Sequence, residues 1–155
     1  MISITVKTTT CNTTGKQFIL GALYYMDTTP KKTILIIEDD PAQRVPLAQT
    51  LTANGFTVIE AVDGKPGFQK ATEFHPDLII LDLIMPEMDG VEFMHLLRNE
   101  PWGLQVPVIM FTNVSPDSDK TIQMIGDVKP AYYIVKGELA LDDIVKKVRE
   151  VLEAQ

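Results

Sequence analysis

Short apolar runs alternate with helix-like segments from Lys31 to the end of the chain, and this alternation restricts the fold more than any other feature. Five runs have the length and composition of strands, and several hold consecutive apolar residues, as strands buried on both faces do. They are Thr33 to Glu38, Phe56 to Glu60, Leu78 to Leu81, Val106 to Thr112 and Ala131 to Lys136. Strands that alternate with helices predict a parallel sheet with right-handed crossovers.

Capping and helix-breaking residues mark the helices between these runs. Asp40 precedes Pro41 and Ser115 precedes Pro116, which is the order of a capping residue followed by proline at the first helical position. Five helices are expected: from Pro41 to before Gly55, from Asp63 to about Phe74, after Asp89, from Ser115 to about Ile125, and from about Ala140 onward. The last helix repeats apolar residues at the helical period, so we expect it to cover one face of the sheet.

The predicted fold is an α/β, doubly wound, five-stranded parallel sheet with helices on both faces and the flavodoxin-like strand order 2-1-3-4-5. In this order the first and third strands are neighbours, and ligands bind beyond their carboxyl ends. Glu38, Asp39 and Asp40 end the first strand, and Asp82 follows the third. We therefore expect Glu38, Asp39 and Asp82 to form a carboxylate cluster that needs a cation or a chemical task. The alternative is that residues 38–40 only cap the first helix, a role that we assign to Asp40.

Charge and composition argue against several classes of function. With 155 residues, 45% of them hydrophobic, the chain is expected to form one ordinary globular domain with an ample core. The formal net charge of −7 argues against a nucleic-acid partner. No apolar stretch reaches the roughly 18 to 20 residues of a membrane span, so no membrane partner is expected. The single cysteine, Cys11, permits no intramolecular disulfide, which is consistent with a reducing, cytoplasmic location.

The first 30 residues differ in composition from the remainder. They are rich in threonine, carry one acid, Asp27, and contain one apolar run, from Phe18 to Met26. The basic segment and small-residue cleavage site of a secretory signal are not clear here. We therefore expect residues 1–30 to be a flexible extension and residues 31–155 to be the folded domain. Met26 could equally be the true start of the protein, and the sequence leaves both alternatives open.

Four motifs, one at each of four strand ends, together resemble the receiver domain of response regulators. They are Ile34-Leu-Ile-Ile-Glu38-Asp39-Asp40, Leu81-Asp82-Leu-Ile-Met-Pro86-Glu-Met-Asp-Gly90, Val108-Ile-Met-Phe-Thr112 and Tyr133-Ile-Val-Lys136. Each motif is weak alone, but the set in this order is highly specific and covers the chain from about Lys31 to its end. The resemblance implies a stand-alone receiver like the chemotaxis regulator, whose strand order is the one predicted above.

The resemblance implies a phosphoacceptor and a metal site. Asp82 corresponds to the phosphoacceptor. Glu38, Asp39, Asp82 and the backbone carbonyl of Ile84 correspond to the groups that hold Mg²⁺. The chemistry suits these residue types, because Mg²⁺ prefers hard oxygen ligands and neutralises charge when a carboxylate attacks a phosphoryl group.

The resemblance also implies how the phosphoryl group is read. Lys136 would pair with one phosphoryl oxygen, and the Thr112 hydroxyl would donate a hydrogen bond to another. Tyr133 corresponds to the switch aromatic, which turns inward when Thr112 moves and so remodels a protein-binding face. The alternative for Tyr133 is a plain packing role.

The chain departs from the family pattern beside this output face. Gly137 follows Lys136 where the family usually has proline after a cis peptide bond, and we expect a trans bond here because a cis bond without proline is costly. The segment from Gly126 to Ala131 is longer than the usual link. Two apolar residues, Ile84 and Val114, lie two positions after Asp82 and Thr112, where the family flanks the path of attacking water.

Together these features predict a phosphoacceptor of a two-component system or phosphorelay. The donor would be a histidine kinase or histidine phosphotransfer protein, and the downstream partner would be a protein that the sequence does not name. We do not class the chain as an enzyme, since it would catalyse only its own Mg²⁺-dependent phosphorylation and dephosphorylation. One alternative is a phosphorylation-independent interaction module on the same fold. A second, an aspartate-nucleophile phosphatase or phosphotransferase, would need an acid where the chain has Ile84.

Overall fold

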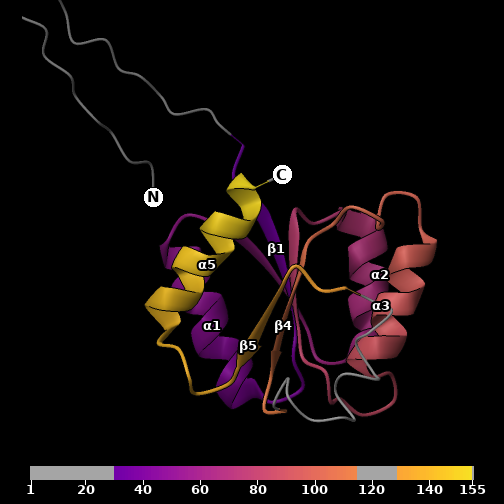
Figure 1. Cartoon of the computed structure of the whole chain (residues 1–155), viewed down its shortest axis with the longest axis horizontal. Coiled ribbons are helices and arrows are strands. Elements are labelled where there is room, and N and C mark those ends of the chain that lie inside the picture. Colours follow the sequence, from indigo (N-terminus) through magenta and orange to yellow (C-terminus); the bar gives the residue numbers. More distant parts are fainter. Residues whose placement is uncertain (1–29, 115–128, 155) are drawn as a thin grey trace, which may run out of the picture. The chain divides into compact units, whose positions relative to one another are not determined.

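Five parallel strands form one sheet in the computed structural model, which describes residues 30–114 and 129–154 (Figure 1). The strands are β1 (Thr33–Ile37), β2 (Thr57–Ala61), β3 (Leu78–Leu81), β4 (Val108–Thr112) and β5 (Tyr132–Val135). Their order is β2-β1-β3-β4-β5, and all neighbours are parallel. The doubly wound, flavodoxin-like sheet predicted from the sequence is therefore confirmed, with small differences in the strand ends.

The helices of the described residues follow the strands in the expected alternation. They are α1 (Pro41–Ala53), α2 (Gly64–Phe74), α3 (Gly90–Asn99) and α5 (Leu141–Glu153). The helix expected between Ser115 and Ile125 lies outside the described residues, and so do residues 1–29 of the expected extension. Within the described part of the chain, no helix is both long enough and apolar enough to cross a membrane.

The burial of each strand agrees with its place in the sheet. All residues of β3 and β4 are buried, and so is β1 after its first residue, because these strands lie in the centre. The edge strands β2 and β5 mix exposed and buried positions. Continuous apolar runs therefore fill the centre, as expected for parallel strands covered on both faces.

Two layers of helices cover the sheet, with α1 and α5 on one face and α2 and α3 on the other (Figure 1). Side chains alternate along each strand, so β1 supplies both layers. Ile34 and Ile36 pack with the buried residues of α1 and α5. Leu35 and Ile37 pack with apolar residues of α2 and α3. Two separate hydrophobic cores thus hold the strand ends in register.

Three aspartates cap the helices that begin at the carboxyl edge of the sheet. Asp40 accepts a hydrogen bond from the Ala42 N–H, Asp63 from the Lys65 N–H and Asp89 from the Glu92 N–H, at 2.8 to 2.9 Å; the helices concerned are α1, α2 and α3. Each cap satisfies a backbone donor that the helix itself leaves free. These acids therefore have a structural task, which sets them apart from Glu38, Asp39 and Asp82.

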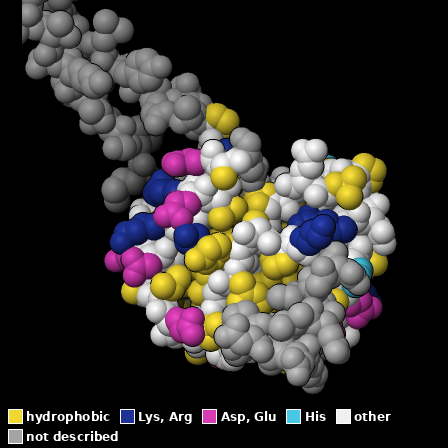
Figure 2. Space-filling model, viewed as in Figure 1, with side chains coloured by type: hydrophobic (Ala, Val, Ile, Leu, Met, Phe, Trp, Pro, Cys, Tyr) yellow, Lys and Arg dark blue, Asp and Glu magenta, His cyan; other side chains and the backbone are white. Residues whose placement is uncertain are grey.

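Side chains of both signs share the exposed surface of α5. Figure 2 shows Lys, Arg, Asp and Glu side chains intermingled over this helix. Lys146 pairs with Asp143 and Lys147 with Glu150 within the helix. Such exposed pairs contribute little stability, and the surface of this helix is a solvated one of mixed charge.

Asp77 connects two strands at the amino-terminal edge of the sheet. Its carboxylate accepts a hydrogen bond from the Lys32 ammonium and another from the Thr33 N–H, both at 2.7 Å. Partial burial acts to raise the pKa of Asp77, but the hydrogen bonds from Lys32 and Thr33 outweigh it and lower the pKa below its ordinary value of 3.8. The start of β1 is thus tied to the residue before β3.

This contact predicts a pH-dependent contribution to stability. Because the folded state lowers the pKa of Asp77, the contribution is present above the unfolded pKa and is lost as the pH falls through the folded pKa. We expect Asp77→Asn to lower the free energy of unfolding by about 1 kcal/mol near pH 7 and by less at a pH below the ordinary pKa of 3.8, where the folded carboxyl group starts to take up a proton, in urea titrations. Glu73→Gln, an exposed acid on α2, is the control. An equal loss at both pH values would contradict the assignment.

Candidate functional site

The predicted site residues come from the carboxyl ends of four strands. Glu38 and Asp39 follow β1, Asp82 follows β3, Thr112 ends β4 and Lys136 follows β5. Backbone hydrogen bonds tie these ends together, because the Asp82 N–H donates to the Ile37 carbonyl at 2.9 Å and the Lys136 N–H donates to the Thr112 carbonyl at 2.8 Å. The structure therefore brings together residues that lie nearly a hundred positions apart in the sequence.

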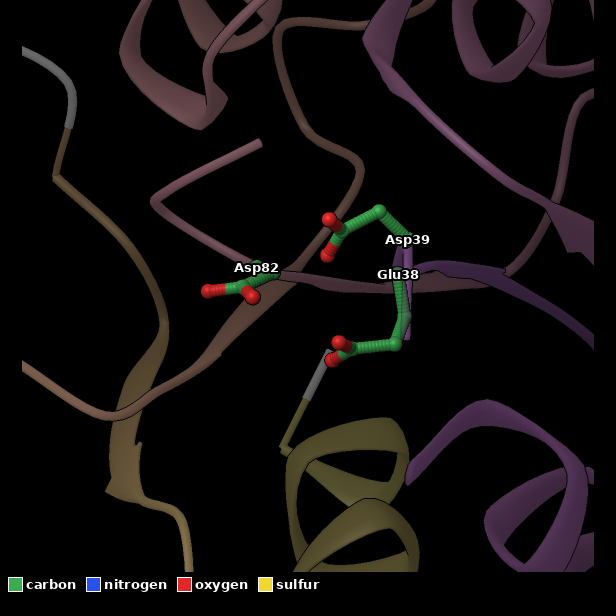
Figure 3. Close-up of side chains that lie close together, drawn as sticks. All are labelled: Glu38, Asp39 and Asp82. Atoms are coloured by element: carbon green, nitrogen blue, oxygen red, sulfur yellow. The ribbon is translucent and has the colours of Figure 1, made fainter. Parts of the chain in front are cut away.

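Three carboxylates converge at this edge. One oxygen from each of Glu38, Asp39 and Asp82 lies within 4.8 Å of the others. Figure 3 shows the three side chains projecting from neighbouring strand ends into the same space. Glu38 and Asp82 are buried, at 1% and 5% exposure, while Asp39 is exposed. Buried carboxylates need charge compensation, so this cluster requires a cation.

Lys136 supplies that positive charge in the structure. Its Nζ lies 2.6 Å from Asp82 Oδ2 and 2.6 Å from Glu38 Oε2, and its side chain is almost fully buried. The contact with Asp82 is a hydrogen bond, whereas the contact with Glu38 Oε2 lacks the angles of one. Glu38 Oε2 is therefore the one buried side-chain oxygen among the described residues that has an ion-pair neighbour but no hydrogen bond.

The ionisation of the two partners reflects this arrangement. Burial is the largest influence on Glu38 and raises the pKa of its carboxyl group, an effect that Lys136 only partly offsets. Burial would lower the pKa of Lys136, but the hydrogen bond to Asp82 and the close ion pair with Glu38 outweigh burial and raise it. Lys136 is thus held as an ammonium ion, and Glu38 gains from any added positive charge.

A cavity of about 270 Å³ opens over these groups. It is lined by Glu38, Asp39, Asp40, Asp82, Ile84, Thr112, Asn113, Val114 and Lys136. Thr112 is buried at 1% exposure, and its hydroxyl accepts a hydrogen bond from the Val114 N–H at 3.4 Å. The sequence did not point to Asn113, which enters the lining only because it follows the end of β4. The cavity is large enough for a phosphoryl group beside Asp82.

The turn after Asp82 is tightly packed against the strand end. The Gly90 N–H donates to the Leu83 carbonyl at 3.0 Å. A side chain at Gly90 would collide with the Asp82 carbonyl oxygen and would lie 2.9 Å from Leu83 Cα. Glu87 has a φ of 61°, a left-handed conformation that is uncommon outside glycine. These contacts fix the backbone of the turn behind the Asp82 side chain, which lines the cavity.

Ile84 and Val114 flank the mouth of the cavity. Ile84 is 54% exposed, and its N–H donates to Asp82 Oδ1 at 3.3 Å. Both side chains line the cavity, as their positions two residues after Asp82 and Thr112 predict. Whether the Ile84 carbonyl binds a metal stays a prediction.

Tyr133 is not part of the cavity lining, but it contacts the loop after β4, which contains Val114. Its hydroxyl donates to the Val114 carbonyl at 2.8 Å. Burial raises the pKa of this phenol, and the charge of Asp82 adds to the effect. Tyr133 is therefore bonded to the residue whose N–H contacts Thr112, a link that its place in the sequence does not reveal.

The peptide bond between Lys136 and Gly137 is trans, since no described residue has a cis peptide bond. The predicted trans bond is confirmed. Gly137 instead has a φ of 85°, which only glycine adopts easily. The chain turns at Gly137 while the Lys136 side chain still reaches Asp82.

The donor set fits Mg²⁺. This ion takes hard oxygen ligands and keeps several water molecules, so a few carboxylates suffice. Glu38, Asp39 and Asp82 supply three such oxygens in one place. Glu38 Oε2 already has the Lys136 ammonium at 2.6 Å, so the residues fit the ion through the hard oxygen atoms that they place together.

Arg44 is a contact that sequence reasoning missed. It lies on α1, and its Nη1 donates to the carbonyls of Glu38 and Asp39, at 2.8 and 3.2 Å. Side chains on a helix point back toward its N-terminus, so an arginine one turn after the Asp40 cap is placed to reach the strand end. That spacing was the available signal.

Comparison with known proteins places the chain in a family. The family model for the response regulator receiver domain matches residues 34–149. The DNA-binding dual master transcriptional regulator RpaA of Synechocystis sp. is 40% identical over 56% of this chain and 36% of its own length. The regulatory protein PhoP of Bacillus subtilis is 35% identical over 59% of this chain and 37% of its own. The chain thus spans about a third of the length of these curated relatives.

Solved structures agree with this family. Chemotaxis protein CheY4 of Vibrio cholerae superimposes with a TM-score of 0.72 and 27% identity, covering 79% of this chain and 99% of that one. A signal receiver domain of a histidine kinase from Syntrophus aciditrophicus gives a TM-score of 0.72 and 28% identity, over 79% and 91%. The residues matched by the family model, 34–149, include the strand-end carboxylates, the threonine and the lysine, and the chain belongs to the response regulator receiver domain family.

Proposed function

We propose that Asp82 accepts a phosphoryl group from a phosphohistidine, carried by a histidine kinase or a histidine phosphotransfer protein. The observation that carries this proposal is the position of the Asp82 carboxylate. It lines an open cavity, its Oδ2 lies 2.6 Å from Nζ of the buried Lys136, and two further carboxylates lie beside it. A carboxylate held between a cation and a cation-binding group is suited to phosphoryl transfer.

In this reaction an Asp82 oxygen attacks phosphorus, the phosphorus–nitrogen bond breaks, and its electron pair returns to the imidazole, which takes up a proton. The incoming phosphoryl group brings negative charge to a site that already holds three carboxylates. Mg²⁺, held by Glu38, Asp39, Asp82 and the Ile84 carbonyl, would neutralise part of the charge that develops. Lys136 already lies within bonding distance of Asp82 and would compensate another part.

Thr112 and Lys136 would report the new group. The Thr112 hydroxyl would donate to a phosphoryl oxygen, and a shift of its oxygen atom toward that group would give up the long hydrogen bond that it accepts from the Val114 N–H. Lys136 would exchange one carboxylate for a phosphoryl oxygen, which is a strong charge-assisted acceptor. Both changes happen in side chains and need no movement of the strands.

Tyr133 would carry the change to the surface. Its hydroxyl holds the carbonyl of Val114, whose N–H contacts Thr112. Loss of the hydrogen bond from the Val114 N–H to Thr112 would let the backbone at Val114 move. The Val114 carbonyl that accepts from Tyr133 would move with it, so the orientation of the tyrosine ring would depend on phosphorylation. The result would be a shift between two packings of a protein-binding face.

The downstream partner is a protein in this proposal. RpaA is named as DNA-binding and is longer than this chain, so nucleic-acid binding belongs to that whole protein. The chain, for its part, has a net charge of −7, which disfavours direct contact with nucleic acid. An interaction module that ignores phosphorylation is the alternative, and the first experiment below separates the two.

Asp82→Asn is expected to abolish phosphorylation without unfolding the chain. Asparagine keeps the size of the side chain but is not a nucleophile. The measurement is the intact mass after incubation with Mg²⁺ and acetyl phosphate, where the wild type should gain one phosphoryl group. Asp40→Asn is the matched control, because asparagine also caps helices and the phosphoryl group should still be gained. A mass gain in Asp82→Asn, or none in the wild type, would refute the proposal.

Phosphorylated Asp82 is expected to be long-lived for a receiver, because Ile84 and Val114 can obstruct attacking water but cannot orient it. Ile84→Asn combined with Val114→Glu should speed hydrolysis by roughly one to two orders of magnitude, if positioning is worth about 1.4 to 2.8 kcal/mol. Loss of the acyl phosphate over time is the measurement. Leu104→Asn, an exposed leucine before β4, should leave the rate unchanged. Equal rates in the wild type and the double variant would show that these side chains do not control water.

A further inference from the structure

Arg44 holds the backbone of the two residues that carry the β1 carboxylates. Its Nη1 donates to the Glu38 carbonyl at 2.8 Å and to the Asp39 carbonyl at 3.2 Å. Its Nε pairs with Glu60 Oε2 at 3.2 Å. The Arg44 side chain is only 13% exposed, so the guanidinium is fixed on several sides. It is the neighbour of the metal-binding residues rather than a member of the cavity lining.

The anchor for Arg44 comes from a different strand. Glu60 lies on β2 and pairs in register with Ile36 of β1, two residues before Glu38. Lys70 of α2 holds the carbonyl of the same Glu60. The Arg44 side chain therefore reaches from α1, past the carboxyl end of β1, to the edge strand β2. Its contact with Glu60 holds it without any contact with the carboxylates of Glu38, Asp39 and Asp82.

The two carbonyls matter because they belong to the peptide planes on either side of Asp39. Rotation of either plane would swing the Asp39 side chain away from Glu38 and Asp82. Among the described residues no side-chain hydrogen bond holds the Asp39 carboxylate itself, and the side chain is exposed. The backbone thus decides where the Cβ atom of Asp39 points and which region its carboxylate can reach, and Arg44 is the side chain that holds this backbone.

We propose that Arg44 is a positioning residue for divalent-cation binding, which orients Asp39 toward Glu38 and Asp82 through the two backbone carbonyls. The inference deepens the proposed function and rests on its metal site. Groups that orient metal ligands without touching the metal have large effects on affinity, because ligand geometry has to be set before the ion arrives.

A purely electrostatic role makes the opposite forecast. A guanidinium near three carboxylates repels a second cation, so its removal would strengthen Mg²⁺ binding if charge were its main effect. Lysine separates the two roles, since it keeps the charge but lacks the planar, multi-donor geometry that holds two carbonyls and a carboxylate at once. Arg44→Lys should then weaken binding under the positioning role and leave it unchanged under the charge role.

The experiment is a calorimetric titration of the whole chain with MgCl₂, together with the melting temperature of each variant. We expect Arg44→Lys and Arg44→Met each to weaken Mg²⁺ binding about tenfold. Arg98→Lys is the matched control, because Arg98 Nη1 also donates to two backbone carbonyls, those of Gly103 and Val106, at the opposite edge of the sheet. Arg98→Lys should lower the melting temperature but keep the Mg²⁺ affinity of the wild type.

Each outcome decides between the roles. Unchanged binding in Arg44→Lys, or stronger binding in Arg44→Met, would overturn the positioning role and leave the proposed phosphoacceptor intact. An equal loss of affinity in Arg98→Lys would show that the effect is one of general stability, and would also overturn it. A wild type that binds no Mg²⁺ would instead refute the metal site of the proposed function, and the role of Arg44 with it.

Discussion

Two buried carboxylates share one buried ammonium at the centre of this structure, and the remaining features of the site depend on that balance. Glu38 and Asp82 would repel each other without Lys136, and removing one partner of such a group leaves an uncompensated charge in the interior. The strand order brings the three together, because β1 and β3 are adjacent and Lys136 follows β5. Positive charge is thus fully engaged in the structure, and an incoming phosphoryl group would have to redistribute it.

Most of the fold could be predicted from the sequence because its signals are local. Apolar runs marked the strands, and aspartates before glycine or proline marked the starts of α1, α2 and α3, so the differences within residues 30–114 and 129–154 lie at the ends of the elements. The edge strand β2 starts at Thr57 rather than Phe56, since the Phe56 N–H donates to the Leu51 carbonyl of α1 and pairing with β1 begins only at Thr57. The grouping of Glu38, Asp39 and Asp82 followed from the predicted strand order, since parallel strands end at one edge. Thr112 and Lys136 joined the predicted site only through the resemblance to receiver domains.

Other contacts could not be predicted because they depend on where long side chains lie in three dimensions. The sequence placed Arg44 on a helix, but whether it would turn to solvent or to the β1 carbonyls depends on how α1 packs against β2. The hydrogen bond from Tyr133 to Val114 likewise requires the loop after β4 to approach a side chain of β5. Position 137 is glycine where the family usually has proline, and Lys136 still reaches Asp82 because Gly137 adopts a positive φ and turns the chain.

The close approach of Gly90 to the Asp82 carbonyl makes the site mechanically one-sided. The backbone behind Asp82 is packed too tightly to shift, so a group added to the Asp82 side chain could not be accommodated by movement on the β3 side. On the β4 side, in contrast, Val114 is held by a long hydrogen bond from its N–H to Thr112 and by one hydrogen bond from the Tyr133 hydroxyl to its carbonyl. Both bonds can change partner at little cost. The proposed phosphorylation of Asp82 would therefore act across the sheet, toward β4 and β5, rather than on the tightly packed turn that leads into α3.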